Sequence, residues 1–351
     1  MKSKAIPILR FIASVIFLTA STLIWADVEQ HIYYEKNSDG TRYVTGAMPN
    51  SDGSLIIPSQ IKDNDKTYDV TGIGSGAFYK NIELKSVSIP NSVTFIGDHA
   101  FYGCSNLTSI SIPNSVTFIG NWAFNGCSSL TSLKVKDGNP MYDSRNNCNA
   151  IIESSTNTLF AGCKTTTIPN GVTSIGLGAF WLCSGLTSII IPNGVTSIGE
   201  EAFRDCNNLA SIVIPNSVTS IGKAAFLNCK GLKSVTCYAD KVPSAGYHTF
   251  LEASIGSATL YVPASALYDY KHTSPWDCFG KFLIIYTPAY LVGDANGNGE
   301  VEIGDVTSVL TLMATPEATG YNNQAADANG NGEIEIGDVP TILTIMANDS
   351  E

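Results

Sequence analysis

Residues 89–111 read IPNSVTFIGDHAFYGCSNLTSIS, and residues 112–134 repeat them as IPNSVTFIGNWAFNGCSSLTSLK. The same 23-residue block starts again at Ile168, Ile191 and Ile214, and a weaker copy precedes Ile89. A repeat of this length is typical of a solenoid, in which each turn covers the apolar face of its neighbour. We therefore expect the whole stack, rather than any single turn, to be the folding unit.

Each block follows the pattern I-P-N-x-V-T-x-I-G-x-x-A-F-x-x-C-x-x-L-x-x-I-x. In the block that starts at Ile191, the fixed and mostly apolar positions are Ile191, Val195, Ile198, Ala202, Phe203, Cys206, Leu209 and Ile212. Branched residues near Ile198 and Ile212 predict two short strands per turn, separated by Pro-Asn and Gly corners. The recurring Ala-Phe pair predicts a column of stacked phenylalanine rings inside the solenoid.

Five of the nine cysteines occupy one register of the repeat. These are Cys104, Cys127, Cys183, Cys206 and Cys229. We interpret them as a column of buried thiols that act as small apolar groups. Disulfides between neighbouring turns, or a metal ladder, are the alternatives, although the clustered spacing of a metal site is missing. A bridge between Cys148 and Cys163 is a separate alternative.

The acidic charge of the chain is concentrated at its C-terminal end. Residues 291–351 contain 11 Asp and Glu and no Lys or Arg, so the rest of the chain is neutral. A neutral body argues against nucleic acid as a partner, because phosphate binding needs a basic surface. An acidic tail rich in Asn and Gly suggests cation binding instead.

The chain begins with the features of a secretory signal peptide, predicted over residues 1–26. Basic residues precede an apolar run that ends near Ala26, and the run is short for a membrane span. No second apolar span follows. We expect a secreted or cell-surface protein without a membrane span after cleavage.

The remaining chain divides into four predicted segments. Residues 27–65 form an N-terminal β cap, and residues 66–287 form the solenoid with its C-terminal cap. Within the solenoid, residues 135–167 are a 33-residue variant turn with a hairpin around 154–157, and the C-terminal cap includes a helix at 266–271. A linker at 288–293 precedes a separate domain at 294–351.

Aromatic residues recur just before or just after the Ala-Phe pair. Tyr79, Tyr102, Trp122 and Trp181 fall there, and together they are our candidate recognition surface for a protein or a glycan. Of the two interpretations, we favour the other, that they are scattered surface aromatics without a role. Ser and Thr occupy most other outward positions of the repeat.

The tail carries the clearest chemical motif, D-x-N-x-N-G-x-x-x-x-x-D, in two copies 33 residues apart. In a calcium loop, positions 1, 3, 5 and 12 supply side-chain oxygens, position 6 needs Gly, and position 7 supplies a carbonyl. The predicted ligands of the first site are Asp294, Asn296, Asn298, Glu300 (backbone) and Asp305. Those of the second site are Asp327, Asn329, Asn331, Glu333 (backbone) and Asp338. Hard oxygen ligands favour Ca²⁺ or Mg²⁺ over zinc, and we expect two Ca²⁺ sites.

Signals for an enzyme are poor. The four histidines have neither metal nor triad spacing, and the glycines at 72–76 belong to the repeat. We therefore expect a protein without catalytic activity. A hydrolase is kept only as a third hypothesis.

Both parts of the chain resemble known families. Residues 66–236, including the NPMYDSRNNCNAIIE insert, resemble BspA-like leucine-rich repeat proteins, which implies a mainly β leucine-rich repeat solenoid, export and adhesion to proteins or cells. Residues 293–346 resemble a type I dockerin, which implies a small all-α, EF-hand-like domain that binds calcium and pairs with a cohesin. At positions 10 and 11, where cohesin-recognising dockerins often carry a hydroxyl pair, this chain has Ile303-Gly304 and Ile336-Gly337.

Two functional hypotheses follow from these features. The first is an exported, non-catalytic recognition or adhesion protein with a calcium-folded docking module. The second is an accessory component of a polysaccharide-degrading complex, attached through dockerin–cohesin pairing. Calcium-dependent capture by a cohesin would separate them.

Overall fold

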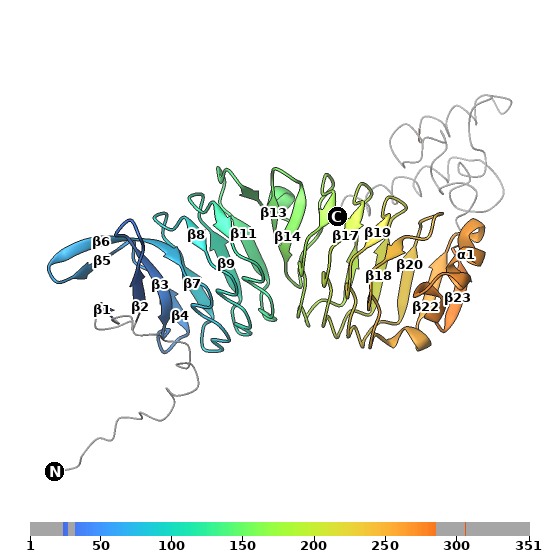
Figure 1. The fold of residues 1–351 in the computed structure, drawn as a ribbon, viewed down its shortest axis with the longest axis horizontal. Helices are drawn as coiled ribbons and strands as arrows, with labels where there is room; N and C mark the ends of the chain where they lie inside the picture. The colour runs from blue at the N-terminus through green and yellow to red at the C-terminus, as the bar shows by residue number, and fades with distance from the viewer. Residues whose placement is uncertain (1–23, 27–31, 286–305, 307–351) are drawn as a thin grey trace, which may run out of the picture. The chain divides into compact units, whose positions relative to one another are not determined.

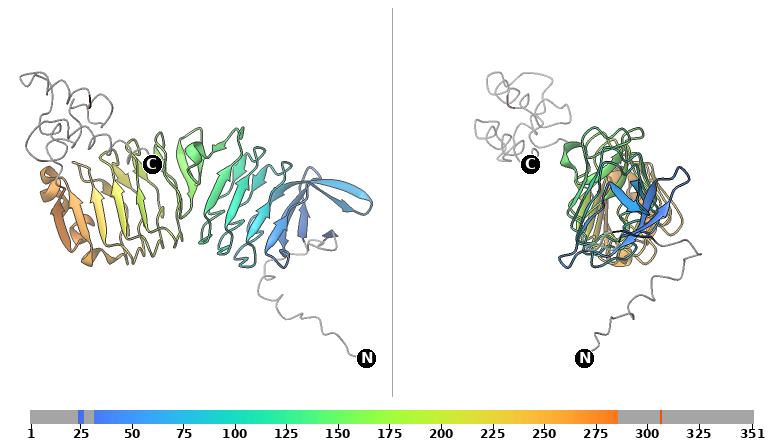
Figure 2. Two further views of the ribbon diagram at one scale, coloured as in Figure 1. Left: turned by 180° about the vertical axis from the view of Figure 1, so that it is seen from behind. Right: turned by 90° about the vertical axis from the view of Figure 1, so that its left-hand side faces the viewer.

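The computed structural model describes residues 24–26, 32–285 and 306 (Figure 1). The chain divides into two compact units, Met1–Leu283 and Ile284–Glu351. The first unit is the predicted solenoid, built almost entirely from short strands (Figures 1 and 2). The described part of the chain contains no helix with the length and hydrophobicity needed to cross a bilayer.

Two ladders of strands form the N-terminal part of the solenoid. The first contains β1 (Ile24–Ala26), β2 (Ile32–Lys36), β3 (Arg42–Ala47), β5 (Gln60–Asp63), β6 (Lys66–Ile73), β8 (Phe95–Ile96) and β10 (Phe118–Ile119). The second contains β4 (Ser54–Ile56), β7 (Ser86–Ser88), β9 (Ser109–Ile112) and β11 (Ser132–Val135). From β3 and β4 onward, successive turns pair in parallel on both ladders. Stacking thus begins inside the segment expected to be the N-terminal cap.

Two further ladders form the C-terminal part. One contains β12 (Tyr142–Asp143), β13 (Ala150–Glu153), β14 (Thr158–Gly162), β15 (Ser174–Ile175), β17 (Ser197–Ile198), β19 (Ser220–Ile221) and β21 (Ser244–Ala245). The other contains β16 (Ser188–Ile190), β18 (Ser211–Ile214), β20 (Ser234–Cys237), β22 (Thr259–Val262) and β23 (Lys281–Ile284). The prediction of two short strands per turn is therefore confirmed.

The core forms because alternate residues of each strand point inward. In β18, Ile212 and Ile214 are buried, whereas Ser211 and Val213 are only partly covered. The 23-residue register places Ser188, Ser211 and Ser234 side by side on neighbouring strands. Each turn thereby buries its apolar side chains against equivalent side chains of the next turn, as the repeat pattern requires.

The predicted column of phenylalanine rings is present in two runs. Phe78, Phe101 and Phe124 stack in the N-terminal part, with ring centroids 5.0 and 5.7 Å apart. Phe180, Phe203, Phe226 and Phe250 stack in the C-terminal part, with centroids 5.0–5.4 Å apart. The break between the two runs falls at the variant turn.

A threonine ladder links neighbouring turns outside the core. Thr117 Oγ1 donates to Thr94 O, and Thr219 Oγ1 donates to Thr196 O, both at 3.3 Å. Glycine is required at the strand end because the backbones of neighbouring turns lie close together there. A Cβ on Gly120 would lie 2.3 Å from the backbone nitrogen of Asp98. The fixed Thr and Gly of the repeat are thus explained by contacts between turns.

Caps close both ends of the solenoid core. At the N-terminal end the buried Arg42 pairs with Asp63 at 3.3 Å and lies over the Tyr68 ring. The C-terminal cap uses the 3₁₀ turns η3 (Ser254–Ser257), η4 (Ala264–Ala266) and η5 (Trp276–Cys278) and the helix α1 (Leu267–His272). Trp276 is fully buried there, and its indole N–H donates to Pro243 O at 3.0 Å. The helix expected at 266–271 is confirmed, shifted by one residue.

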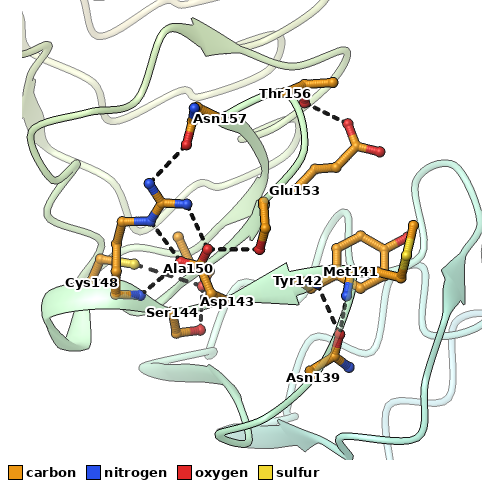
Figure 3. Close-up of polar contacts among 12 residues, drawn as sticks. Asn139, Met141, Tyr142, Asp143, Ser144, Cys148, Ala150, Glu153, Thr156 and Asn157 are labelled. Carbon is orange, nitrogen blue, oxygen red and sulfur yellow. Dashed lines mark hydrogen bonds and ion pairs between the residues drawn. The ribbon is translucent and has the colours of Figure 1, made fainter.

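The variant turn contains the predicted hairpin, formed by antiparallel β13 and β14. A short 3₁₀ segment, η2 (Arg145–Asn147), precedes it. Arg145 donates to both carboxylate oxygens of Asp143 and to Asn157 Oδ1, at 2.6–2.8 Å (Figure 3). Burial alone would raise the pKa of Asp143, but the hydrogen bonds from Arg145 and Ser154 hold it below its ordinary value. This network fastens the hairpin to the loop before it.

Of the predicted signal segment, only Ile24–Ala26 lies among the described residues. These three residues form β1, which pairs antiparallel with β2. Cleavage after Ala26, as expected from the sequence, would remove this strand.

Candidate functional site

One corner of each turn presents variable side chains to the solvent. This corner holds the Ala-Phe pair, and the residue before it has a positive φ in every regular turn. These residues are Gly76, His99, Trp122, Gly178, Glu201 and Ala224, and His248 has the same backbone conformation before the equivalent Thr249-Phe250. A left-handed backbone is costly for a bulky residue such as Trp122, so the stack must hold it in place. The corner is thus a rigid frame that carries different side chains in different turns.

The four predicted recognition residues come together at this corner. The Tyr79 and Tyr102 rings stack with centroids 5.2 Å apart and planes 8° apart. Trp181 contacts Tyr102 at 5.9 Å and Trp122 at 6.1 Å, edge to face in both cases. His99 completes the group, 5.1 Å from Trp122 and 5.5 Å from Tyr102. We call Tyr79, His99, Tyr102, Trp122 and Trp181 the aromatic edge cluster.

Trp122 and Trp181 are neighbours in space although 59 positions separate them in the sequence. The variant turn does not extend to this corner, so the corner of the turn before it is in direct contact with the corner of the turn after it. Gly126 N donates to Trp181 O at 3.4 Å, and Asn125 Nδ2 donates to Gly178 O at 2.9 Å. The four rings are therefore clustered rather than scattered, whereas their role in recognition stays a prediction.

Charged side chains hold Trp181 in one orientation. Its indole N–H donates to Asp205 Oδ2 at 3.0 Å, and the Arg204 guanidinium lies over its ring at 5.0 Å. Arg204 also pairs with Glu201 at 2.6 Å. Burial raises the pKa of Tyr102 above its ordinary value. The cluster is therefore a fixed aromatic surface flanked by charges of both signs.

Sequence reasoning missed His99, Arg204 and Asp205 as members of this surface. His99 aligns with Trp122 in the repeat, and Arg204 aligns with Trp181. That alignment was a usable signal, because equivalent positions of neighbouring turns must lie side by side.

The five cysteines in one register are buried and unpaired, in agreement with the interpretation as small core groups. Four of the five thiols donate to a phenylalanine carbonyl of the preceding turn, as Cys206 does to Phe180 O at 3.0 Å. Burial raises the pKa of the Cys183 thiol to about 12. Cys148 and Cys163 are also free, and no cluster of three metal-ligating side chains occurs in the described part of the chain.

The ten predicted calcium ligands lie outside the described residues. They are Asp294, Asn296, Asn298, Glu300, Asp305, Asp327, Asn329, Asn331, Glu333 and Asp338. The donor set fits Ca²⁺, because each loop offers carboxylate and amide oxygens with glycine at the tight turn. The assignment of two sites to these residues stays a prediction.

Solved structures with similar folds come from several bacteria. A leucine-rich cell surface protein from Faecalibacterium prausnitzii is 20% identical, with a TM-score of 0.37 over 77% of this chain and 96% of that chain. The pneumococcal vaccine antigen PcpA is 16% identical, with a TM-score of 0.43 over 75% and 98%. A leucine-rich repeat protein from Bacteroides ovatus is 24% identical, with a TM-score of 0.41 over 72% and 75%. A search of the curated proteins found no match.

Family comparisons match both parts of the chain. Residues 292–342 match the family described as Dockerin type I domain, whose members generally bind calcium. Residues 60–158 and 152–270 match the family described as BspA type Leucine rich repeat region, in six copies. With more than half of its length matched, this chain belongs to the BspA type leucine-rich repeat family.

Proposed function

We propose that this chain is an exported, non-catalytic recognition protein with two binding regions. The aromatic edge cluster of the solenoid binds a protein or a glycan, and the C-terminal module docks to a second protein when calcium is bound. Proteins of both families are typically found at the cell surface or secreted. Neither family is a catalytic type. The observation that carries the proposal is the meeting of Tyr79, Tyr102, Trp122 and Trp181 in one cluster.

The composition of the cluster supports a role in recognition. Trp, Tyr and Arg are the residue types enriched at binding hot spots. Their rings supply a large contact area with few rotatable bonds, so little conformational entropy is lost on binding. Half of the Tyr79 surface is exposed, and Arg204 lies beside Trp181. The surface can thus offer apolar contact together with paired charges.

A second candidate function is supported by the match at residues 292–342. In this case the chain is an accessory component of a polysaccharide-degrading complex, attached through dockerin–cohesin pairing. Because Ile-Gly stands where cohesin-recognising dockerins often have a hydroxyl pair, we rank this function second.

A binding array of glycans and extracellular-matrix proteins tests the recognition surface. The full chain from residue 27 is compared with Tyr79→Ala and Trp181→Ala variants. Tyr247→Ala is the matched control, because Tyr247 is 73% exposed at an equivalent corner outside the cluster. We expect both cluster variants to lose at least about tenfold in affinity for whatever the unmodified chain binds, the loss typical of a hot-spot residue. Equal affinity in all four proteins would exclude the cluster as the surface.

Capture by immobilised cohesins, with calcium and with a chelator, tests the second function. Capture with calcium that is lost with the chelator favours attachment to a cohesin-bearing complex. Absence of capture in both conditions leaves recognition by the solenoid as the function. Turnover on a glycan panel, abolished by substitution of one acidic pair, would support the hydrolase hypothesis instead.

A further inference from the structure

Neighbouring regular turns are joined in several ways at once. Between the turns that contain Phe180 and Phe203, the rings stack 5.0 Å apart. The thiol of Cys206 donates to Phe180 O at 3.0 Å, and both strand ladders pair in parallel. In a solenoid, stability is roughly the sum of such contacts between neighbouring turns. A boundary that lacks them is therefore a weak point.

The boundary at the variant turn lacks most of these links. The first two ladders end at β10 and β11, and the other two contain no strand from the preceding turns. No ring contact joins Phe124 to Phe180 among the described residues. Cys183 is the one thiol of the five-residue column without a carbonyl partner in the part of the chain that the structure describes.

The hairpin of the variant turn divides the apolar interior into two cores. Ile151 and Ala161 belong to the core of the N-terminal turns. Ala150, Ile152 and Leu159 belong to the core of the C-terminal turns. Alternate residues of a strand point to opposite faces, so one hairpin seals both cores without joining them. Figure 1 shows β13 and β14 between β11 and β17.

A small set of contacts joins the two corners directly. Asn125 Nδ2 donates to Gly178 O at 2.9 Å, Gly126 N donates to Trp181 O at 3.4 Å, and the Trp181 ring contacts both Trp122 and Tyr102. The buried indole N–H of Trp122 has no hydrogen-bond partner among the described residues. Leaving a buried donor unpaired is costly, and opening the boundary would let water pair with it. We call these contacts the clasp. The boundary that they hold together is consequently weaker than a boundary between two regular turns.

We propose that the solenoid consists of two cooperative units, residues 32–134 and 168–285, which open against each other at the variant turn. Tyr79, Tyr102 and Trp122 belong to the first unit and Trp181 to the second. Opening separates Trp181 from the other rings, so the aromatic edge cluster is complete only when the clasp is closed. This last consequence rests on the proposed function, whereas the opening itself does not.

Hydrogen exchange of the full chain from residue 27 in increasing, sub-denaturing urea tests the opening without any ligand. We expect the amide of Gly126, which donates to Trp181 O across the boundary, to exchange through an opening that leaves β9 and β18 protected. We also expect the two units to lose protection at different urea concentrations. A common urea dependence of all protected amides would overturn the proposal. A binding array that shows no role for the aromatic edge cluster would not affect this result, because the exchange experiment uses no ligand.

A pair of matched variants sharpens the test. Asn125→Ala removes the side-chain bond of the clasp, and we expect about fivefold faster exchange of the Gly126 amide, as for the loss of one ordinary hydrogen bond. Asn208→Ala is the control, because Asn208 Nδ2 donates to Ser184 O at 2.8 Å between two turns of the second unit. Asn125→Ala should also increase quenching of tryptophan fluorescence by acrylamide. Equal effects of both variants on exchange of the Gly126 amide would contradict a special role for the clasp.

Discussion

The indole N–H of Trp181 donates to the carboxylate of Asp205, one turn further along the solenoid, at 3.0 Å. The same carboxylate accepts a bond from Asn228 Nδ2 in the following turn and lies 3.3 Å from Arg204 Nε. One acidic side chain therefore links three successive turns at the edge of the candidate recognition surface. Asp205 also has a φ of +59°, a conformation that Asp and Asn adopt more readily than most residues.

Substitutions of Asp205 should destabilise the C-terminal turns in a defined order. Asp205→Ala removes every hydrogen bond of the side chain and adds backbone strain, so we expect a loss of about 2–4 kcal/mol in the free energy of unfolding. Asp205→Asn keeps the backbone preference and one acceptor oxygen, but it cannot accept from Trp181 and Asn228 on both sides. Its loss should be about half as large. Urea denaturation followed by circular dichroism measures both.

Glu200→Ala provides the matched control for this series, because Glu200 is an exposed acidic residue of the same turn. We expect its effect to stay within about 0.5 kcal/mol. If Asp205→Ala were no more destabilising than Glu200→Ala, Asp205 would not be the link that the structure indicates.

The fold was predictable because the repeat fixes which residues are neighbours. Ile212 and Phe203 could be placed in the core from periodicity alone, and both are buried. The meeting of Trp122 with Trp181 was not predictable, because the path of the variant turn decides it. That path depends on contacts such as Arg145 with Asp143, which no repeat unit specifies. The start of stacking at β3 and β4 was missed because those strands lack the block sequence.

Removal of one ring from the phenylalanine column should be strongly destabilising. Phe203 is fully buried between Phe180 and Phe226. We expect Phe203→Ala to cost about 3–5 kcal/mol, the usual range for loss of a buried aromatic side chain and the resulting cavity. Thermal unfolding followed by calorimetry gives the measurement. Tyr247→Ala, at an exposed ring, should leave the melting temperature nearly unchanged, and a comparable drop in both variants would contradict the prediction.

The buried thiols should make the solenoid sensitive to alkaline pH. Burial raises the pKa of Cys104 and of Cys183 to about 12, whereas an unfolded thiol titrates near its ordinary value. Because the pKa of these thiols is raised in the folded state, the stabilisation gained by burying the protonated thiols is complete below about pH 8.5. This stabilisation is lost as pH rises toward 12. Urea denaturation at pH 7, 9 and 10.5 should therefore show falling stability. Cys183→Ala should show a shallower fall between pH 9 and 10.5.

Reaction with a thiol reagent checks the same burial at neutral pH. Eight of the cysteines in the described solenoid are buried, and only Cys278 is exposed. The thiolate is the reactive form, and burial keeps a thiol protonated and out of reach of the reagent. We therefore expect one rapidly reacting thiol in the native chain and nine after denaturation. Rapid reaction of more than one native thiol would show that the column is not sealed. Cys278→Ser should abolish the fast phase.

The C-terminal module should require calcium for its structure, because its two acidic loops concentrate carboxylates that repel one another without a cation. We expect Asp294→Ala combined with Asp327→Ala to abolish the calcium-dependent protection of amides in residues 294–346. Unfolding of the solenoid should be unchanged, because the substitutions lie outside the repeat. Glu317→Ala is the control, since it removes an acidic residue between the two motifs and outside both. Hydrogen exchange with calcium and with a chelator makes the comparison, and equal protection of the unmodified tail in both conditions would show that calcium does not order it.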